Sequence, residues 1–203
     1  MIAIVDYGVG NLFSLESSFN AIGQDVKVTS DPRDLREADR IVLPGVGAFE
    51  DAAKKLKSSG LAEPLLEEIG TGKPLLGICL GMQLLFTKSY EFGEHEGLNL
   101  IPGSVRYIGE VIPAGLKIPQ IGWNSLQLGT RSEEAGIIQR EGEYVYFVHS
   151  YAAFCDERYI TATTNYGADL TAAVQNKNIY GVQFHPEKSG NVGLNILREF
   201  CNV

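Results

Sequence analysis

The sequence of 203 residues predicts an α/β fold, in which helices flank a central, mostly parallel sheet and an antiparallel extension follows in the second half. Two patterns support this prediction. In the first half, short β-rich runs alternate with segments of helical periodicity, as in successive strand and helix units. In the second half, strand-like runs follow one another with only turn residues between them. The chain shows no internal repeat, low-complexity tract or linker, so we expect one domain over residues 1–203.

The first half supplies the predicted parallel strands and the helices that connect them. Its strand-like runs are rich in Val, Ile and Leu, and they cover residues 2–6, 25–30, 40–45 and 73–79. Helical spacing of apolar residues predicts helices over residues 10–23, 49–60 and 61–72. The run at 73–79 is almost wholly apolar, which is typical of a strand buried on both faces of a parallel sheet.

The second half is predicted to add strands over residues 104–109, 121–128, 143–151, 159–166 and 179–185. The density of these runs favours an antiparallel extension or a second layer of strands. A closing helix is expected over residues 190–203, with Val192, Ile196 and Phe200 on one face.

Composition and charge exclude several classes of protein. A formal net charge of −8 leaves no overall basic field for the phosphate backbone of nucleic acids. The longest apolar stretches fall well short of the roughly 18 residues that a membrane-spanning helix needs. Residues 1–8, MIAIVDYG, contain no basic segment and no cleavage-like site, so they are expected to form a strand and not a signal peptide. We therefore expect a cytoplasmic protein that binds neither nucleic acid nor membrane.

The three cysteines of the chain, Cys79, Cys155 and Cys201, form no CxxC pair and lack the spacing of metal ligands. An odd number without such spacing disfavours a disulfide framework and a zinc site, so we expect three free thiols and no metal. Cys155 and Cys201 have neither glycine flanks nor a nearby base, and they are expected to be small core residues.

Cys79 lies in the segment Gly77-Ile78-Cys79-Leu80-Gly81, between an apolar strand and a helix-like run. A sharp strand-to-helix turn crowds the positions two residues either side of its apex, and glycine removes the Cβ at both. The segment has the form of the G-x-S-x-G nucleophile elbow, with Cys in place of Ser. The apex side chain would then be exposed above the sheet edge, near the positive end of the following helix, which favours thiolate. The alternative is that Cys79 is a small buried hydrophobe.

A thiol nucleophile needs a base, and the base needs an orienting group. His95 lies in the acidic segment EFGEHEGLN and is expected to be a solvated surface residue. His149 ends an apolar run and could be a core histidine with satisfied hydrogen bonds. Residues i and i+2 of an extended chain point to the same side, so Glu187 can orient His185 toward Cys79. We therefore predict a triad of Cys79, His185 and Glu187; the alternative is a strand-end His beside a surface Glu.

Six sequence blocks resemble the class I, or triad-type, glutamine amidotransferases. They are DYGVGNLFS (6–14), LPGVGAF (43–49), GICLGMQLLF (77–86), PQIGWN (119–124), YFVHSY (146–151) and GVQFHPEKS (181–189). The cysteine and His-Pro-Glu blocks carry the resemblance to the class. The opening and Gly-Trp-Asn blocks are most similar to the glutaminase subunits of imidazole glycerol phosphate synthases.

The resemblance implies that Cys79 attacks the side-chain amide of L-glutamine, that His185 protonates the departing ammonia, and that water hydrolyses the thioester to glutamate. It also implies two backbone N–H donors for the negative oxygen, at Val46 and Leu80. Glycines on both sides of Val46 would let its peptide rotate, although a Pro-Gly-Val-Gly segment is also a tight turn without catalytic duty. The residues expected to bind glutamine are Gln83, His149, Ser150 and Tyr151. No cofactor is implied.

Free ammonia would be protonated and lost in water, so the resemblance implies a docked acceptor enzyme. In this family the acceptor is a (β/α)₈-barrel cyclase subunit of histidine biosynthesis, which forms a heterodimer with the glutaminase. The residues expected to form or gate that interface are Asn11, Trp123, Tyr146 and Lys188. Trp123 could instead fill the core. Gln120 departs from relatives that carry His at this position, which puts in doubt any interface role for an ionisable group there.

Two other interpretations stay open. The chain could be an amidotransferase subunit of another synthase, or a free glutaminase. It could also be a thiol sensor or binding module on a similar fold, with Cys79 oxidised for signalling. The His-Pro-Glu segment weighs against a sensor, because a sensor cysteine needs no paired His and Glu.

Overall fold

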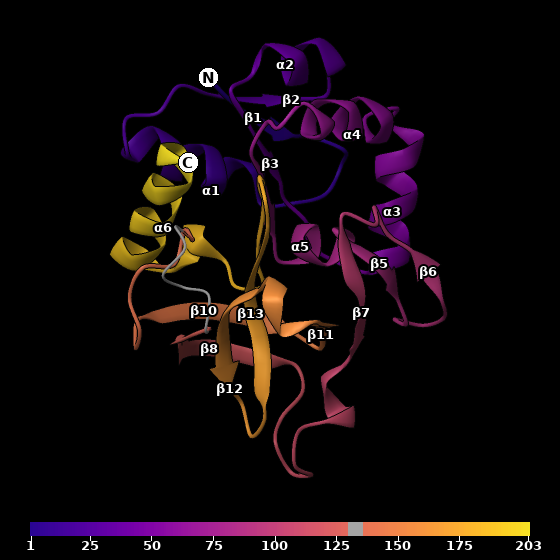
Figure 1. The fold of residues 1–203 in the computed structure, drawn as a ribbon, viewed down its shortest axis with the longest axis vertical. Helices are drawn as coiled ribbons and strands as arrows, with labels where there is room; N and C mark the ends of the chain where they lie inside the picture. The colour runs from indigo at the N-terminus through magenta and orange to yellow at the C-terminus, as the bar shows by residue number, and fades with distance from the viewer. Residues whose placement is uncertain (130–135) are drawn as a thin grey trace.

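The structure, a computed structural model, describes residues 1–129 and 136–203 and has one large sheet between two layers of helices (Figure 1). The strand order is β2-β1-β3-β4-β14-β13-β12-β9. The strands from β2 to β14 run parallel, and β13, β12 and β9 continue the sheet antiparallel. In this order the strands are Val26–Thr29, Ile2–Val5, Arg40–Leu43, Leu75–Ile78, Ile179–Val182, Asp169–Asn176, Ile160–Asn165 and Gln127–Leu128. The predicted α/β fold with an antiparallel extension is confirmed.

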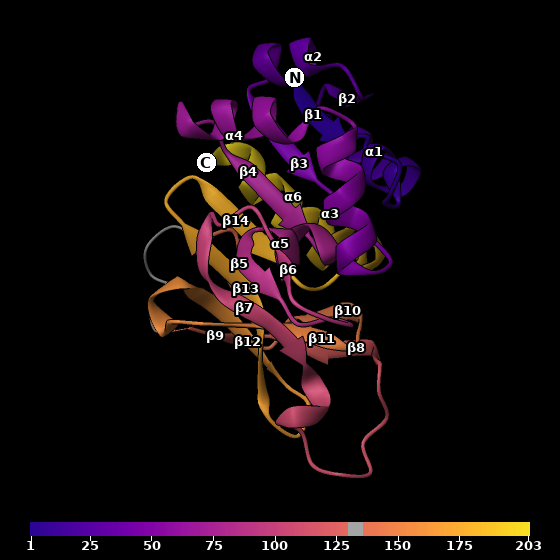
Figure 2. The same cartoon turned by 90° about the vertical axis from the view of Figure 1, so that its right-hand side faces the viewer.

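Helices pack on both faces of this sheet, as the side view in Figure 2 shows. They are α1 (Leu12–Ala21), α2 (Pro32–Glu37), α3 (Phe49–Ser58), α4 (Ala62–Gly70), α5 (Leu80–Leu84) and α6 (Gly190–Asn202). The core on one face contains α1 and α6, and the core on the other contains α2, α3, α4 and α5. Within the described residues, no helix has the length and apolar character that a membrane crossing demands.

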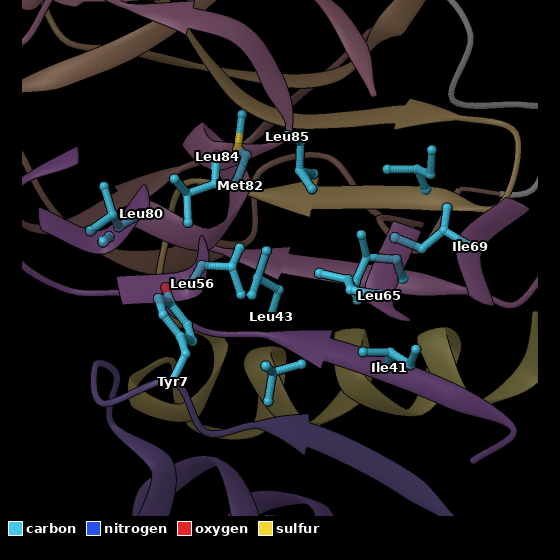
Figure 3. Packing of buried hydrophobic residues seen from close by; sticks show 14 of the residues in the cluster. Tyr7, Ile41, Leu43, Leu56, Leu65, Ile69, Leu80, Met82, Leu84 and Leu85 are labelled. Carbon is cyan, nitrogen blue, oxygen red and sulfur yellow. The ribbon is translucent and has the colours of Figure 1, made fainter. Parts of the chain in front are cut away.

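Alternate residues of the central strands face the two helical layers. In β1, Ala3 and Val5 belong to the core with α3 and α4, whereas Ile2 and Ile4 belong to the core with α1 and α6. Figure 3 shows the first of these cores, where aliphatic side chains of α3 and α4 lie over those of β3. Because both faces are covered, the central strands must be apolar on both sides, which explains the continuous apolar run at 73–79.

Two smaller sheets complete the fold beside the lower part of the large one in Figure 1. One pairs β8 with β10 antiparallel, and the other has the order β11-β7-β5-β6. Their strands are β5 (Phe86–Ser89), β6 (His95–Glu96), β7 (Ile101–Tyr107), β8 (Gln120–Ser125), β10 (Tyr144–His149) and β11 (Tyr151–Cys155). The short 3₁₀ helices are η1 (Ile108–Glu110), η2 (Glu157–Tyr159) and η3 (Pro186–Lys188).

Two predicted strands of the second half each divide between two sheets, so the long strands expected there are wrong. The run at 121–128 forms β8 and then β9, with Leu126 buried between them. The run at 143–151 forms β10 and the start of β11, with Ser150 between them. A continuous β-rich run predicts strand conformation but not the neighbouring strand, and here different neighbours redirect the chain at a single residue.

Some elements were not predicted. The helical pattern after Cys79 lasts only through α5, because Phe86 already begins strand β5. β13 returns antiparallel from β12, so two adjacent strands occupy a stretch for which only one was expected. α2 starts at Pro32, and the Asp31 side chain before it accepts the backbone N–H of Arg33 at 2.9 Å. A capping Asp followed by Pro is a helix-start signal, so this helix was predictable.

Helix α6 packs closely against η3 and β3. Gly193 faces the carbonyl oxygen of Pro186, and a Cβ at position 193 would lie 1.9 Å from that oxygen. At the other end, Arg40 of β3 donates to the backbone oxygens of Phe200 and Val203 at 3.1 and 2.6 Å. These contacts seat the helix on the parallel sheet and support the segment that follows β14.

We predict that Gly193→Ala destabilises the protein by about 1–3 kcal/mol or more, because the new methyl group must displace either α6 or η3. Thermal unfolding measures this as a lower midpoint. Asn191→Ala, an exposed position on the same helix, is the matched control and should leave the midpoint nearly unchanged. Equal midpoints for the two variants would contradict the packing described.

Candidate active site

Cys79 occupies a sharp turn between β4 and α5. Its backbone has φ 55° and ψ −111°, a left-handed conformation that is costly for a residue with a Cβ. A Cβ at Gly77 would lie 2.8 Å from the Gly81 oxygen, and one at Gly81 would lie 1.9 Å from the Leu43 oxygen. Both flanking glycines are therefore required by close backbone packing, and the tight strand-to-helix turn predicted from the sequence is confirmed.

The Cys79 side chain faces a cavity of about 290 Å³ at the ends of β4 and β14. The predicted site residues that line it are Val46, Cys79, Leu80, Gln83, His149, Ser150, Tyr151 and His185. Cys79 is only 8% exposed, so the expectation of a side chain standing free above the sheet is wrong. The loops around the elbow enclose the sulfur, and α5 is too short to supply a full helix dipole.

His185 and Glu187 form a buried pair beside this cavity. The Nδ1 atom of His185 lies 2.8 Å from Oε1 of Glu187, and the two side chains are 3% and 1% exposed. Burial acts to lower the pKa of His185, but hydrogen bonds to Cys79 and Glu187, together with their charges, outweigh it and raise that pKa to about 10. A surface Glu beside a strand-end His, the alternative from the sequence, does not describe this pair.

Strand β10 holds the backbone of His185 in place. The His185 N–H donates to the Tyr146 oxygen at 2.9 Å. Ser189 links the same two residues, because its hydroxyl donates to the His185 oxygen at 2.6 Å and accepts the Tyr146 N–H at 3.0 Å. The imidazole is thus oriented by contacts that join β14, η3 and β10.

The loop after β3 carries Val46 to the mouth of the cavity. The Tyr7 hydroxyl donates to the Pro44 oxygen at 2.7 Å and fixes the start of this loop. Gly47 has φ 98°, a backbone conformation that favours glycine. Gly45 has another purpose, because a Cβ there would lie 2.7 Å from the Gly81 nitrogen. It permits close packing on the elbow, and it also bounds the peptide that carries the Val46 N–H, whose expected rotation stays a prediction.

Three of the four residues expected at an interface form one stack on the surface. The Trp123 ring lies 4.9 Å from the Tyr146 ring, and the Lys188 ammonium lies 5.7 Å from the centre of that ring. Trp123 is 63% exposed, so it does not fill the core. Asn11 is not part of the stack; it is the residue before α1, a helix that packs beside η3, which contains Lys188.

The other two histidines differ from each other. His149 is buried, lines the cavity and places Nδ1 2.9 Å from the Tyr151 oxygen; burial lowers its pKa to about 4. His95 was expected to be solvated, but its side chain is only 18% exposed and its Nε2 is buried without a partner among the described residues. It lines a separate cavity of about 460 Å³ that contains neither Cys79 nor His185.

The remaining cysteines lie away from the cavity. Burial raises the pKa of Cys155 to about 11 and also raises that of Cys201, so both favour the unreactive thiol. All three cysteines are free. Over residues 1–129 and 136–203, no group of three or more His, Cys, Asp or Glu side chains is arranged to hold a metal ion.

Two polar residues of the site were missed from the sequence. Glu91 lines the cavity and accepts the Phe49 N–H at 2.7 Å, and burial raises its pKa. It lies among several acidic residues, so no local signal distinguished it. Gln183 is fully buried with its Nε2 3.8 Å from the Cys79 sulfur. A polar residue inside the apolar run IYGVQF was a signal that could have identified it.

The family model "Glutamine amidotransferase class-I" matches residues 3–202. A protein of Syntrophotalea carbinolica named imidazole glycerol phosphate synthase subunit HisH is 48% identical, with 100% of each chain covered. Proteins of the same name from Methanothermobacter thermautotrophicus and Geobacter metallireducens are 50% and 49% identical; 100% and 98% of this chain are covered, and 98% and 97% of theirs.

Solved structures with much lower identity share the fold. A glutamine amidotransferase crystal structure superposes with a TM-score of 0.77 at 16% identity, over 100% of this chain and 98% of that one. The structure of PurLQS from Thermotoga maritima has a TM-score of 0.74 at 18% identity, over 99% and 97%. With a family match over nearly all residues and relatives near 50% identity, this chain belongs to the class-I glutamine amidotransferase family.

Proposed function

We propose that this chain is the glutaminase subunit of an imidazole glycerol phosphate synthase, acting as one domain that hydrolyses L-glutamine and passes ammonia to a cyclase in histidine biosynthesis. Relatives that bear the name of this subunit are 46–50% identical over nearly the full chain. The observation that carries the chemistry is that Cys79 and His185 line one cavity, with His185 hydrogen-bonded to the buried carboxylate of Glu187.

The proposed reaction begins with a proton on His185. The raised pKa of His185 keeps the imidazole cationic at neutral pH, next to a sulfur that serves as the nucleophile. The Cys79 sulfur attacks the side-chain amide carbon of glutamine, and the carbonyl oxygen becomes negative. When the carbon–nitrogen bond breaks, the imidazolium gives its proton to the departing nitrogen, which leaves as ammonia. His185 then accepts a proton from the water that hydrolyses the thioester.

Backbone N–H groups are proposed to stabilise the negative oxygen. Leu80 follows the nucleophile directly, and Val46 lies across the cavity on the loop after β3. A donor of this kind contributes roughly 3–4 kcal/mol in other acyl-transfer enzymes. The peptide that carries the Val46 N–H joins Gly45 to Val46, and its rotation would turn that N–H toward the substrate, so this loop is the proposed switch of activity.

The remaining lining residues are proposed to bind the rest of glutamine. Gln83 and the segment 149–151 surround the cavity next to Cys79. Glu91 adds a buried carboxylate, which is suited to bind the substrate's α-ammonium group. The cavity thus combines a nucleophile at one end with polar groups that recognise an amino acid.

The proposed partner is a cyclase subunit with a (β/α)₈ barrel, which would receive ammonia without releasing it to water. The exposed stack of Trp123, Tyr146 and Lys188 is the proposed centre of this interface, with Asn11 at its edge. A large aromatic ring that is well exposed in the free chain is typical of an interface anchor. Tyr146 also pairs with the backbone of His185, so the interface and the site share a strand.

We predict that Cys79→Ala lowers glutamine hydrolysis by roughly a thousandfold or more, because no other described group in the cavity can form a thioester. Glutamate release measures this. Cys201→Ala, which removes a half-buried thiol on α6, is the matched control and should keep normal activity. Glutamine hydrolysis retained by Cys79→Ala would contradict the assignment of Cys79 as the nucleophile.

We predict that Glu187→Gln moves the alkaline limit of activity to lower pH by about one to three units. The carboxylate helps to raise the pKa of His185, so its loss lets the imidazolium deprotonate at lower pH. The pH profile of kcat/KM for glutamate release measures the shift, and the rate should fall less than in Cys79→Ala. Glu157→Gln, at an exposed position, is the control; an unmoved alkaline limit in Glu187→Gln would contradict the role of Glu187.

We predict that a cyclase subunit of imidazole glycerol phosphate synthase, together with its nucleotide ligand, raises the rate of glutamate release by this chain. Trp123→Ala should raise the cyclase concentration needed for half-maximal stimulation by about tenfold, since exposed aromatic anchors dominate interfaces. Leu66→Ala on α4, at the other end of the molecule in Figure 1, is the control. Stimulation only by another synthase subunit would favour that assignment instead.

A further inference from the structure

Gln183 is a buried polar side chain, and its amide therefore needs hydrogen-bond partners. It is 0% exposed and lies between Val182 and Phe184, which are also fully buried. An amide without hydrogen bonds in such surroundings costs several kcal/mol. The parallel register pairs Val182 with Ile78, so the next residues of the two strands, Gln183 and Cys79, lie side by side. The Gln183 Nε2 atom lies 3.8 Å from the Cys79 sulfur.

A fixed acceptor determines which end of the Gln183 amide faces the sulfur. The backbone oxygen of Tyr151 can only accept a hydrogen bond, so the Gln83 atom 3.0 Å from it is the amide nitrogen. The same nitrogen lies 3.0 Å from Gln183 and donates its second hydrogen there, so it faces the amide oxygen. The nitrogen of Gln183 is therefore turned toward Cys79.

A second hydrogen bond to the Tyr151 carbonyl is consistent with this orientation of the amides. His149 also lies on the Tyr151 oxygen, with Nδ1 at 2.9 Å, so Nδ1 carries a hydrogen and the neutral ring has a free lone pair on Nε2. Gln120 places its Oε1 3.0 Å from that Nε2, where two acceptors would meet, while its own Nε2 has no partner among the described residues. A half-turn of the Gln120 amide presents its nitrogen to the ring. The Tyr151 oxygen then accepts one hydrogen bond from Gln83 and one from His149. Neither side chain can turn its own acceptor atom toward that oxygen.

We propose that Gln183 is a further catalytic residue, whose side-chain N–H donates to the Cys79 sulfur and stabilises its thiolate. The hydrogen bond acts before the attack on glutamine. It acts again when water cleaves the thioester, because the electron pair of the carbon–sulfur bond then returns to sulfur. A distance of 3.8 Å is long, and catalytic hydrogen bonds in unliganded sites often shorten when the charge forms. α5 has only five residues, so a side-chain donor adds to a weak helix dipole.

The proposal rests on the proposed function only for the identity of the nucleophile, and alkylation of Cys79 tests it without glutamine. The variant Gln183→Glu keeps an oxygen for Gln83 but has no N–H for the sulfur. We expect the midpoint of the pH dependence of Cys79 alkylation by iodoacetamide to move up by about one pH unit or more. Gln127→Glu, the same change at an exposed position, should leave the midpoint in place. An unmoved midpoint in folded Gln183→Glu overturns the proposal.

A second variant and a measurement on the unaltered protein cover the case in which that variant fails to fold. Gln183→Met has similar length without the amide, and it should also move the alkylation midpoint up. In the unaltered protein, the NMR signals of the Gln183 side-chain NH₂ group should shift with the same midpoint, and in Cys79→Ala that shift should vanish. NH₂ signals that do not respond to ionisation of Cys79 overturn the proposal. If alkylation behaves as expected but glutamate is not released, the proposed function fails while the hydrogen bond stands.

Discussion

The left-handed backbone of Cys79 is the constraint on which the rest of the site depends. Such a conformation at a non-glycine residue persists only where the surrounding structure holds it. Here the Cys79 N–H is bound by the Val182 oxygen at 2.8 Å, and Gly81 lets α5 touch the end of β3. The same close approach brings Gly45 against the elbow. The nucleophile and the two proposed oxyanion donors therefore belong to one packed unit.

The imidazole depends on a different support. His185 is tied through its backbone and Ser189 to Tyr146 of β10, and the Tyr146 ring contacts both Trp123 and Lys188. A partner that binds the exposed face of this stack would thus contact the strand that holds the base. The connection is short and made of direct contacts, so coupling between the proposed interface and the cavity needs no long chain of side chains.

Directional hydrogen bonds order the buried polar groups behind the cavity. Both the imidazole of His185 and the amide of Gln183 lie next to the sulfur. Each is oriented by a group that can only accept a hydrogen bond: the Glu187 carboxylate for the imidazole and the Tyr151 carbonyl for the amides. In a low-dielectric interior such contacts are stronger than in water, and unsatisfied groups are costly. These hydrogen bonds therefore fix a single orientation for each buried polar side chain of the site.

The sequence by itself determined the parallel strands, the glycine-flanked turn at Cys79 and the close spacing of His185 and Glu187, because periodicity and steric crowding act over a few residues. It could not determine that the runs at 121–128 and 143–151 divide between sheets, or that Cys79 is enclosed. Only the tertiary structure decided that β14 lies beside β4 in the register that sets Gln183 next to Cys79. Sheet order and register arise from packing between segments a hundred residues apart, and no local pattern encodes that packing.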